Sequence, residues 1–204
     1  MPTPRLAAVL AVAATVLVAA GAAEAQVVEV SPAVAYRLGF SSLYYFSGTT
    51  ADVAGGTSYG IAVDVRYASD RTVEGLFSRQ AADVVVTDES GLPVRIRVTV
   101  DYWHGGATQE FGYGRVRPFL AGTLGLTRYW EAGLSAYRFS VGAGGGVKLW
   151  ATRNLGARLD GRIFATIVNG NQSIGICGGG GCLVHINVGV IWQADFSAGV
   201  LVAF

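Results

Sequence analysis

Residues 183–204 read LVHINVGVIWQADFSAGVLVAF, and every second residue of this stretch is apolar. The apolar set consists of Val184, Ile186, Val188, Val190, Trp192, Ala194, Phe196, Ala198, Val200, Val202 and Phe204. Polar residues such as Asn187, Gln193 and Asp195 lie between them. A period of two residues indicates a β-strand, but this pattern is far longer than the roughly five to six residues of an ordinary strand. Its length suits a tilted strand that crosses a bilayer, which needs about 9–11 residues in the hydrocarbon.

The composition of the chain agrees with strands that span a membrane. Of 204 residues, 51% are hydrophobic and 14% are charged. Beyond the N-terminus, no uninterrupted apolar run reaches the roughly 18 residues of a membrane helix, whereas a transmembrane barrel distributes its apolar residues in alternation. The 29 glycines suit close strand packing and sharp turns. A net charge of +1 gives no indication of nucleic-acid binding.

An export signal is predicted at the N-terminus. Arg5 supplies a positive start, residues 6–20 form an apolar core, and Ala23-Glu24-Ala25 has the form of a cleavage site. The alternative is an uncleaved membrane anchor, but the apolar core is short and rich in alanine. We therefore predict that residues 1–25 are a cleaved signal peptide and that residues 26–204 are the mature domain. Export would make disulfide formation chemically possible.

Seven further stretches of alternating polarity precede the last one. We predict strands over residues 27–40, 58–68, 71–80, 94–102, 116–129, 137–150 and 155–168. The links 41–57, 81–92, 130–136 and 169–182 are long or moderate, and the other three are shorter, with Gly112-Tyr113-Gly114 as one turn. Bacterial outer-membrane barrels have short periplasmic turns and longer extracellular loops. The alternation of link lengths therefore supports such a barrel independently of the hydrophobic pattern.

Alternation alone does not identify the inner face of a barrel. A soluble β-sandwich or a lipocalin-type barrel would place the apolar residues inside. Here the polar set carries charges in nearly every strand, and the apolar set is rich in Val, Leu and Phe, with Tyr and Trp suited to membrane interfaces. We predict an all-β chain that forms an eight-stranded antiparallel up-and-down transmembrane β-barrel, in which the last strand pairs with the first.

Several stretches carry a resemblance to a known family. They are SYGIAVD (58–64), VEGLFSRQ (73–80), RPFLAG (117–122), residues 139–148 and 155–162, and the terminal Phe204. With them, the chain resembles the small OmpA/OmpX-like outer-membrane β-barrel proteins, also called the outer membrane protein beta-barrel domain or porin family. The resemblance covers essentially the whole mature chain. It implies a cell outer-membrane location and a structural, adhesive or protective role without a catalytic set, and it gives Phe204 as a signal for the barrel-assembly machinery.

The charges predicted to face inward are the main candidate site. They are Arg37, Asp64, Arg66, Glu74, Arg95, Arg97, Asp101, Arg138, Arg158, Asp160, Arg162 and Asp195, with Glu29, Arg117 and Lys148 on the same faces. The interior of eight strands is just wide enough for side chains to fill, and unpaired buried charges are costly. This width favours a lumen plugged by paired charges. The basic excess favours the alternative, a narrow, weakly anion-selective, porin-like channel.

Two cysteines flank a run of four glycines in the last long link. In an exported chain, Cys177 and Cys182 predict a disulfide. A metal site would need further ligands, and His185 is the only candidate nearby. We therefore expect neither a bound metal nor a cofactor.

No catalytic set is evident, and we predict a protein without enzymatic activity. A lipid-modifying barrel enzyme would need a nucleophile beside a histidine and an acid. Of the two histidines, His104 is expected toward the periplasmic half, and His185 follows Ser173 with no acid beside it. The glycine run 142–146 lacks the features of a nucleotide loop. We expect a monomer with four extracellular loops, in contact with outer-membrane lipid and lipopolysaccharide, and no nucleic-acid partner.

Overall fold

The computed structural model describes residues 27–38, 41–44, 50–53, 55–87, 93–131, 134–167, 175–178, 181–185 and 190–204. The predicted signal peptide, residues 1–25, lies outside them. The strands are β1 (Val28–Leu38), β2 (Ser41–Tyr44), β3 (Thr50–Val53), β4 (Gly56–Ala68), β5 (Arg71–Thr87), β6 (Pro93–Glu110), β7 (Val116–Glu131), β8 (Leu134–Trp150), β9 (Leu155–Ile167), β10 (Gly175–Gly178), β11 (Gly181–His185) and β12 (Val190–Ala203). Among the described residues, no helix is long and apolar enough to cross a membrane.

Eight of these strands close a barrel. Their order is β5-β4-β1-β12-β9-β8-β7-β6, and β6 pairs again with β5. The last strand joins the first through antiparallel pairs such as Val34 with Ala198. The backbone N–H of Phe204 also donates to the carbonyl of Val28 at 2.9 Å. The predicted eight-stranded antiparallel up-and-down barrel is therefore confirmed.

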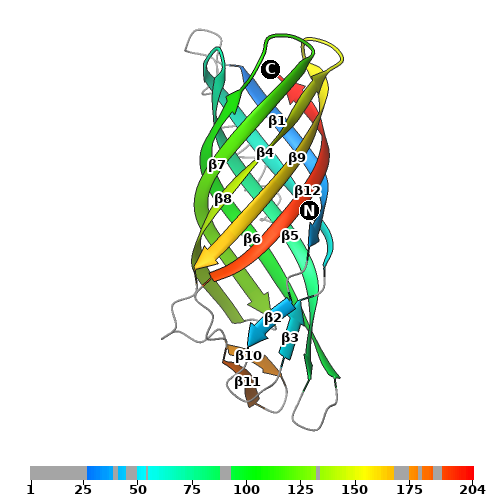
Figure 1. Ribbon diagram of the computed structural model, residues 1–204, viewed down its shortest axis with the longest axis vertical. Coiled ribbons are helices and arrows are strands. Elements are labelled where there is room, and N and C mark those ends of the chain that lie inside the picture. Colours follow the sequence, from blue (N-terminus) through cyan, green and yellow to red (C-terminus); the bar gives the residue numbers. More distant parts are fainter. Residues whose placement is uncertain are drawn as a thin grey trace, which may run out of the picture.

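The two ends of the barrel differ (Figure 1). At one end, called here the short-turn end, residues 69–70, 111–115 and 151–154 connect neighbouring strands. Gly112 has φ +90°, a left-handed conformation that glycine adopts without steric cost. The opposite end is called here the loop end. The strands β5 and β6, which are 17 and 18 residues long, extend to it. There β3 continues the sheet by pairing with β5, and β10 and β11 form a separate two-stranded sheet.

Several predicted strand and link limits are wrong. The strand predicted over residues 94–102 continues to Glu110, and most of the predicted link 130–136 belongs to β7 and β8, where Glu131 pairs with Leu134. The strand predicted over residues 183–204 begins only at Val190, because Leu183 belongs to β11. β11 pairs with β10, with Ile176 opposite Val184. The first residues of the alternating pattern therefore belong to a local hairpin and not to the barrel strand. The predicted link 81–92 is also mostly strand, since Val84 to Val86 in β5 pair with β6.

In seven of the eight barrel strands, the observed facing agrees with the prediction. Charged and polar residues such as Glu29, Arg37 and Lys148 are buried inside. The outward positions form an exposed apolar band, which includes Val34, Tyr36, Tyr59, Ile61, Val73, Leu120, Leu124, Leu126, Phe139, Val141, Leu159, Ile163, Trp192, Phe196 and Val200. An outward apolar band that encircles a closed barrel is typical of a wall that faces lipid.

In β6 the predicted facing is wrong. Val98, Val100 and Tyr102 are buried inside the barrel, whereas Trp103 is 54% exposed on the outer wall. Consequently Arg97 and Asp101, both predicted inside, belong to the outward set. The Arg97 side chain is 79% exposed and lies 3.6 Å from Asp83. Near the loop end, the outer wall carries charged residues and the lumen carries apolar ones. In this part of β6, polarity therefore does not identify the face that points to lipid.

Candidate functional site in the charged lumen

Lys148 lies at the centre of the charge network near the short-turn end. Its side chain is fully buried, and its Nζ lies 2.5 Å from Glu29 Oε2, 2.8 Å from Glu110 Oε1 and 3.0 Å from Asp64 Oδ2. Arg66 reaches two of the same carboxylates, at 2.6 Å to Glu29 and 3.0 Å to Glu110. These residues come from β1, β4, β6 and β8, so the network joins opposite walls of the barrel.

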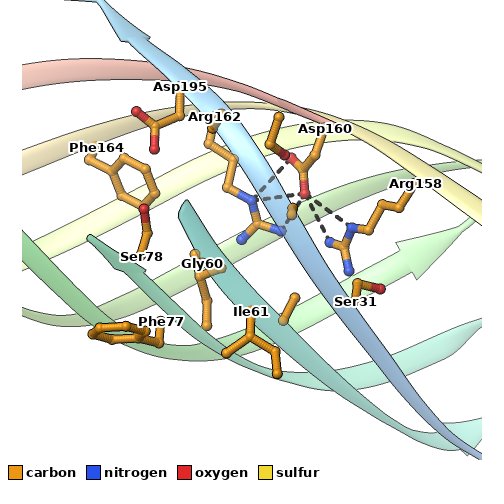
Figure 2. A pocket seen from close by; sticks show the side chains of 15 residues that line it. Ser31, Gly60, Ile61, Phe77, Ser78, Arg158, Asp160, Arg162, Phe164 and Asp195 are labelled. Atoms are coloured by element: carbon orange, nitrogen blue, oxygen red, sulfur yellow. Dashed lines mark hydrogen bonds and ion pairs between the residues drawn. The ribbon is translucent and has the colours of Figure 1, made fainter. Parts of the chain in front are cut away.

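A second part of the network is built on β9. Arg158, Asp160 and Arg162 alternate along the strand and therefore share its inner face. Arg158 donates to Asp64 at 2.9 Å and to Glu74 at 2.6 Å. Arg162 donates to Glu74 at 2.5 Å and to Asp160 at 2.8 Å. Figure 2 shows Asp160 between the two guanidinium groups, which it holds in place.

The network is balanced in charge. Five carboxylates, those of Glu29, Asp64, Glu74, Glu110 and Asp160, meet five cations, Arg66, Arg117, Lys148, Arg158 and Arg162. The basic excess that favoured an anion-selective lumen is therefore not a property of this cluster. Between this network and the short turns, a buried apolar cluster consists of Trp150, Leu201 and Ala203, which pack against Val27.

Toward the loop end, the lumen holds one ion pair and several aromatic rings. Arg37 donates to both oxygens of Asp195, at 2.5 and 2.7 Å, and to Ser78 Oγ at 2.7 Å. Its guanidinium carbon lies 4.6 Å from the centre of the Tyr102 ring. The Tyr102 hydroxyl donates to Gln193 at 2.6 Å, and its ring stacks on Phe164 at 4.3 Å. Aromatic side chains thus occupy space that charges occupy nearer the short turns.

A small cavity lies between these two regions of the lumen. Its volume is about 50 Å³, and Ser31, Gly60, Ser78, Arg162 and Asp195 are among the residues that line it (Figure 2). A water molecule in the liquid takes about 30 Å³. The cavity therefore has room for a few waters.

His104 is buried in the lumen. Its ring nitrogens hydrogen-bond to the hydroxyls of Thr123 at 3.0 Å and Ser140 at 2.8 Å. These two contacts satisfy both nitrogens and explain a buried histidine without a catalytic role. Across the described residues, no group of three or more His, Cys, Asp and Glu side chains is placed to hold a metal ion.

The structure brings together eight of the predicted lumen residues: Arg37 with Asp195, and Asp64, Arg66, Glu74, Arg158, Asp160 and Arg162 in the larger network. Arg138 faces inward but donates to the carbonyl of Tyr137 at 2.9 Å. Asp101 instead pairs with Arg79 on the outer wall. The side chain of Arg95 lies outside the part that the structure describes.

Glu110 is a network residue that the sequence prediction omitted. It lies at the end of β6, beyond Gly105 and Gly106, where the strand pattern is weak. An unbroken strand through these glycines would have given Glu110 the parity of His104 and Thr108, which are also buried. Tyr102 has the same parity and was predicted to face outward, so this parity would have placed Glu110 in the lumen only after the facing of β6 was corrected.

Cys177 and Cys182 lie opposite each other in the β10–β11 ladder. Directly opposed residues of antiparallel strands have Cα atoms roughly 4.5–5.5 Å apart, a separation that a disulfide can bridge. Their sulfur atoms lie outside the part that the structure describes, so the bond stays a prediction.

A closed antiparallel barrel with an apolar exterior and a charged interior defines the class of membrane-spanning β-barrels. No family model and no curated protein matches the sequence. Among solved structures, Neisserial surface protein A (NspA) is similar with a TM-score of 0.58 and 20% identity, over 87% of this chain and 97% of that chain. Outer membrane protein H (OprH) from P. aeruginosa gives a TM-score of 0.49 and 15% identity, over 88% of this chain and 100% of that chain. The chain has the fold of the small eight-stranded outer-membrane β-barrels.

Proposed function

We propose that this chain is an integral outer-membrane barrel with a closed lumen and a structural or surface-interaction role. The outer-membrane fold and the exposed apolar band support the location, with export through a signal peptide over residues 1–25. One observation carries the function: a balanced ion-pair network joins opposite walls of the lumen around Lys148. A protein with such a plug serves as a stable membrane anchor for whatever its loop end presents.

The energetics of buried ion pairs support a closed lumen. Removing one partner of a buried pair costs about 3–5 kcal/mol, because the other charge is left uncompensated. A water-filled path past Lys148 and Arg158 would require several of these contacts to break together. The apolar cluster around Trp150 would still cover the short-turn end.

The form of the loop end supports a surface-interaction role. The ladder of β5 and β6 continues beyond the last pairing of β6 with β7, between Thr99 and Trp130. The β2–β3 and β10–β11 hairpins lie at the same end (Figure 1). The similar Neisserial protein is a surface protein by its name. We propose no enzymatic activity, since both ring nitrogens of the buried His104 hydrogen-bond to hydroxyls and neither bonds to a carboxylate.

Two measurements test this proposal. Membrane fractionation with a heat-modifiability gel should place the protein in the outer membrane, with a faster-moving unboiled form. A soluble protein whose mobility ignores boiling would overturn the location. Purified barrel in a planar bilayer should show no steady conductance steps. Steady single-channel steps would overturn the closed lumen and favour the narrow, weakly anion-selective channel.

We further propose that Phe204 acts in assembly by the barrel-assembly machinery and that the barrel is a monomer. The Phe204 backbone closes the ladder to Val28, while its side chain is exposed. Deleting Phe204 should therefore reduce the amount of barrel inserted in cells more than it lowers the stability of barrel already folded. Normal insertion of the truncated chain would count against this role.

A further inference from the structure

A row of five polar side chains crosses the outer wall of the barrel. Register pairs join Tyr59 to Arg79, Arg79 to Asp101, Asp101 to Arg128 and Arg128 to Tyr137. The row thus follows the hydrogen-bonding direction through β4, β5, β6, β7 and β8. All five positions have outward parity, and both tyrosines are exposed. We call these residues the arginine row.

Asp101 holds the arginine row together and leaves it with a net positive charge. Although outward, Asp101 is only 1% exposed, because Arg79 donates to its two oxygens at 2.6 and 2.8 Å. Arg128 lies 4.0 Å from the same carboxylate, beyond hydrogen-bond distance. Two guanidinium groups therefore share one carboxylate, and both remain partly exposed on the wall, at 38% for the Arg79 side chain and 31% for that of Arg128.

The arginine row lies at the boundary between the apolar wall and the loop end. The next register row toward the short turns consists of Ile61, Phe77, Trp103, Leu126 and Phe139. Phe77 and Trp103 pack with ring centres 4.4 Å apart. Aromatic side chains in such a barrel concentrate at the membrane interface. The arginine row, one row farther out, is therefore at head-group level on the loop-end side.

On the short-turn side of the aromatic row, four small residues lie on the outer wall of β5, β6 and β7, beside the larger Val73 and Leu124. Gly75, Gly105, Ala107 and Gly122 have outward parity, and Gly75 pairs directly with Gly105. Nothing lies within 4 Å of the place that a Cβ would occupy at Gly105 or Gly122. This part of the wall leaves space beneath the arginine row for the acyl chain of a lipid.

We propose that the arginine row binds a phosphate of the phosphorylated glycolipid of the outer leaflet, lipopolysaccharide. Guanidinium groups recognise phosphate through paired N–H donors. The Asp101 carboxylate orients Arg79 before the lipid arrives, and the partly exposed guanidinium group of Arg128 lies beside it without a hydrogen bond to Asp101. This inference rests on the proposed outer-membrane location, and it names the lipid and the residues that hold it.

The test measures binding of purified lipid A to refolded barrel in zwitterionic detergent micelles. The parent protein should bind phosphorylated lipid A at least about tenfold more tightly than dephosphorylated lipid A, because the dephosphorylated form offers no anion for charge-assisted hydrogen bonds from the two guanidinium groups. The double variant Arg79→Gln/Arg128→Gln should lose about that factor. Arg71→Gln is the matched control, since Arg71 is outward on β5 at the short-turn end and bonds to Gln109.

Each other outcome is decisive. Equal affinity for the two forms of lipid A overturns the proposal even where the double variant fails to fold. Equal losses in the double variant and in Arg71→Gln show a general charge effect and also overturn it. Equal affinity for phosphatidylglycerol assigns the site to phospholipid and rejects the glycolipid. The heat-modifiability gel of the parent tests the outer-membrane barrel separately, so failure of one proposal is distinguishable from failure of the other.

Discussion

The two halves of the lumen are built differently. Near the short-turn end, four of the five cations of the network have two or three carboxylate partners, and Arg117 has one. Near the loop end, Arg37 and Asp195 form one ion pair among aromatic and hydroxyl side chains. We call the lumen near the loop end the outer half and the lumen near the short-turn end the inner half. Buried polar atoms without a described partner are more frequent in the outer half, on Arg37, Ser58, Gln80, Tyr129 and Arg138. In the inner half they occur on Ser31, Asp64 and Trp150.

This difference assigns the proposed closure of the lumen to the network near the short-turn end. Multiple partners make the inner half a unit in which no single pair opens alone, because each charge other than Arg117 is also held by a second neighbour. The outer half depends on one pair and on packing, so polar atoms without protein partners there are positioned for water. The inner half should therefore tolerate substitution least.

The largest effect is expected for Lys148→Met. It leaves Glu29, Asp64 and Glu110 without their common cation inside the barrel. The free energy of unfolding should fall by about 5 kcal/mol, the upper part of the range for breaking a buried pair. Urea unfolding of barrel refolded in lipid vesicles measures it. Arg153→Met, in an exposed turn, is the control and should change little. A loss below about 1 kcal/mol for Lys148→Met would remove the distinction between the halves.

A smaller effect is expected for Arg37→Met, at about 3 kcal/mol, because one carboxylate loses one partner. The double variant Arg37→Met/Asp195→Leu should recover most of this loss, since apolar replacement of a whole buried pair is often neutral. The same unfolding measurement tests both variants. A double variant no more stable than Arg37→Met would show that the arginine acts mainly through Ser78 or Tyr102.

Tyr102→Phe should cost about 1 kcal/mol, the contribution of one net hydrogen bond. It removes the hydroxyl that donates to Gln193 and keeps the ring on Phe164. Tyr102→Ala is the comparison, because it also removes the stacked ring and should cost about 3–5 kcal/mol. Equal losses in the two variants would mean that the hydroxyl, and not the packing, stabilises the outer half.

The smallest effect is expected at the predicted disulfide. Replacing Cys177 and Cys182 by serine should leave barrel stability within about 0.5 kcal/mol, because within the described residues the β10–β11 sheet pairs with no barrel strand. Thiol labelling under denaturing conditions should require prior reduction in the parent chain. Labelling without reduction would refute the disulfide, and a large loss of barrel stability would refute the independence of this hairpin.

The amino-acid sequence predicts the barrel and most of its facing. The alternation is strong in β4, β8 and β9, where charges and large apolar residues occupy opposite faces. Link lengths were a weaker guide, because most of the predicted links 81–92 and 130–136 is strand. The alternation places Arg158, Asp160 and Arg162 inside. It does not identify the carboxylates they meet, since these depend on the register between strands distant in the chain.

The reversed face of β6 shows where this approach stops. Val98, Val100 and Tyr102 have the polarity of lipid-facing residues, yet Tyr102 packs against Arg37 in the lumen. A two-residue period shows that the two faces of a strand differ. It does not show which face points inside the barrel. The same error hid the arginine row, because Asp101 was assigned to the lumen while Arg79 and Arg128 were not considered as its partners.

The length of the β5–β6 hairpin fixes a height above the membrane. About ten residues of a tilted strand suffice to cross the hydrocarbon, and β6 has 18. At about 3.3 Å per residue and a tilt near 40°, the remaining part rises about 20 Å beyond the lipid. The last described ladder pair, Thr87 with Pro93, therefore lies far outside the lipid. A partner that binds there has to project to that height, whereas a molecule lying flat on the membrane would meet only the wall below.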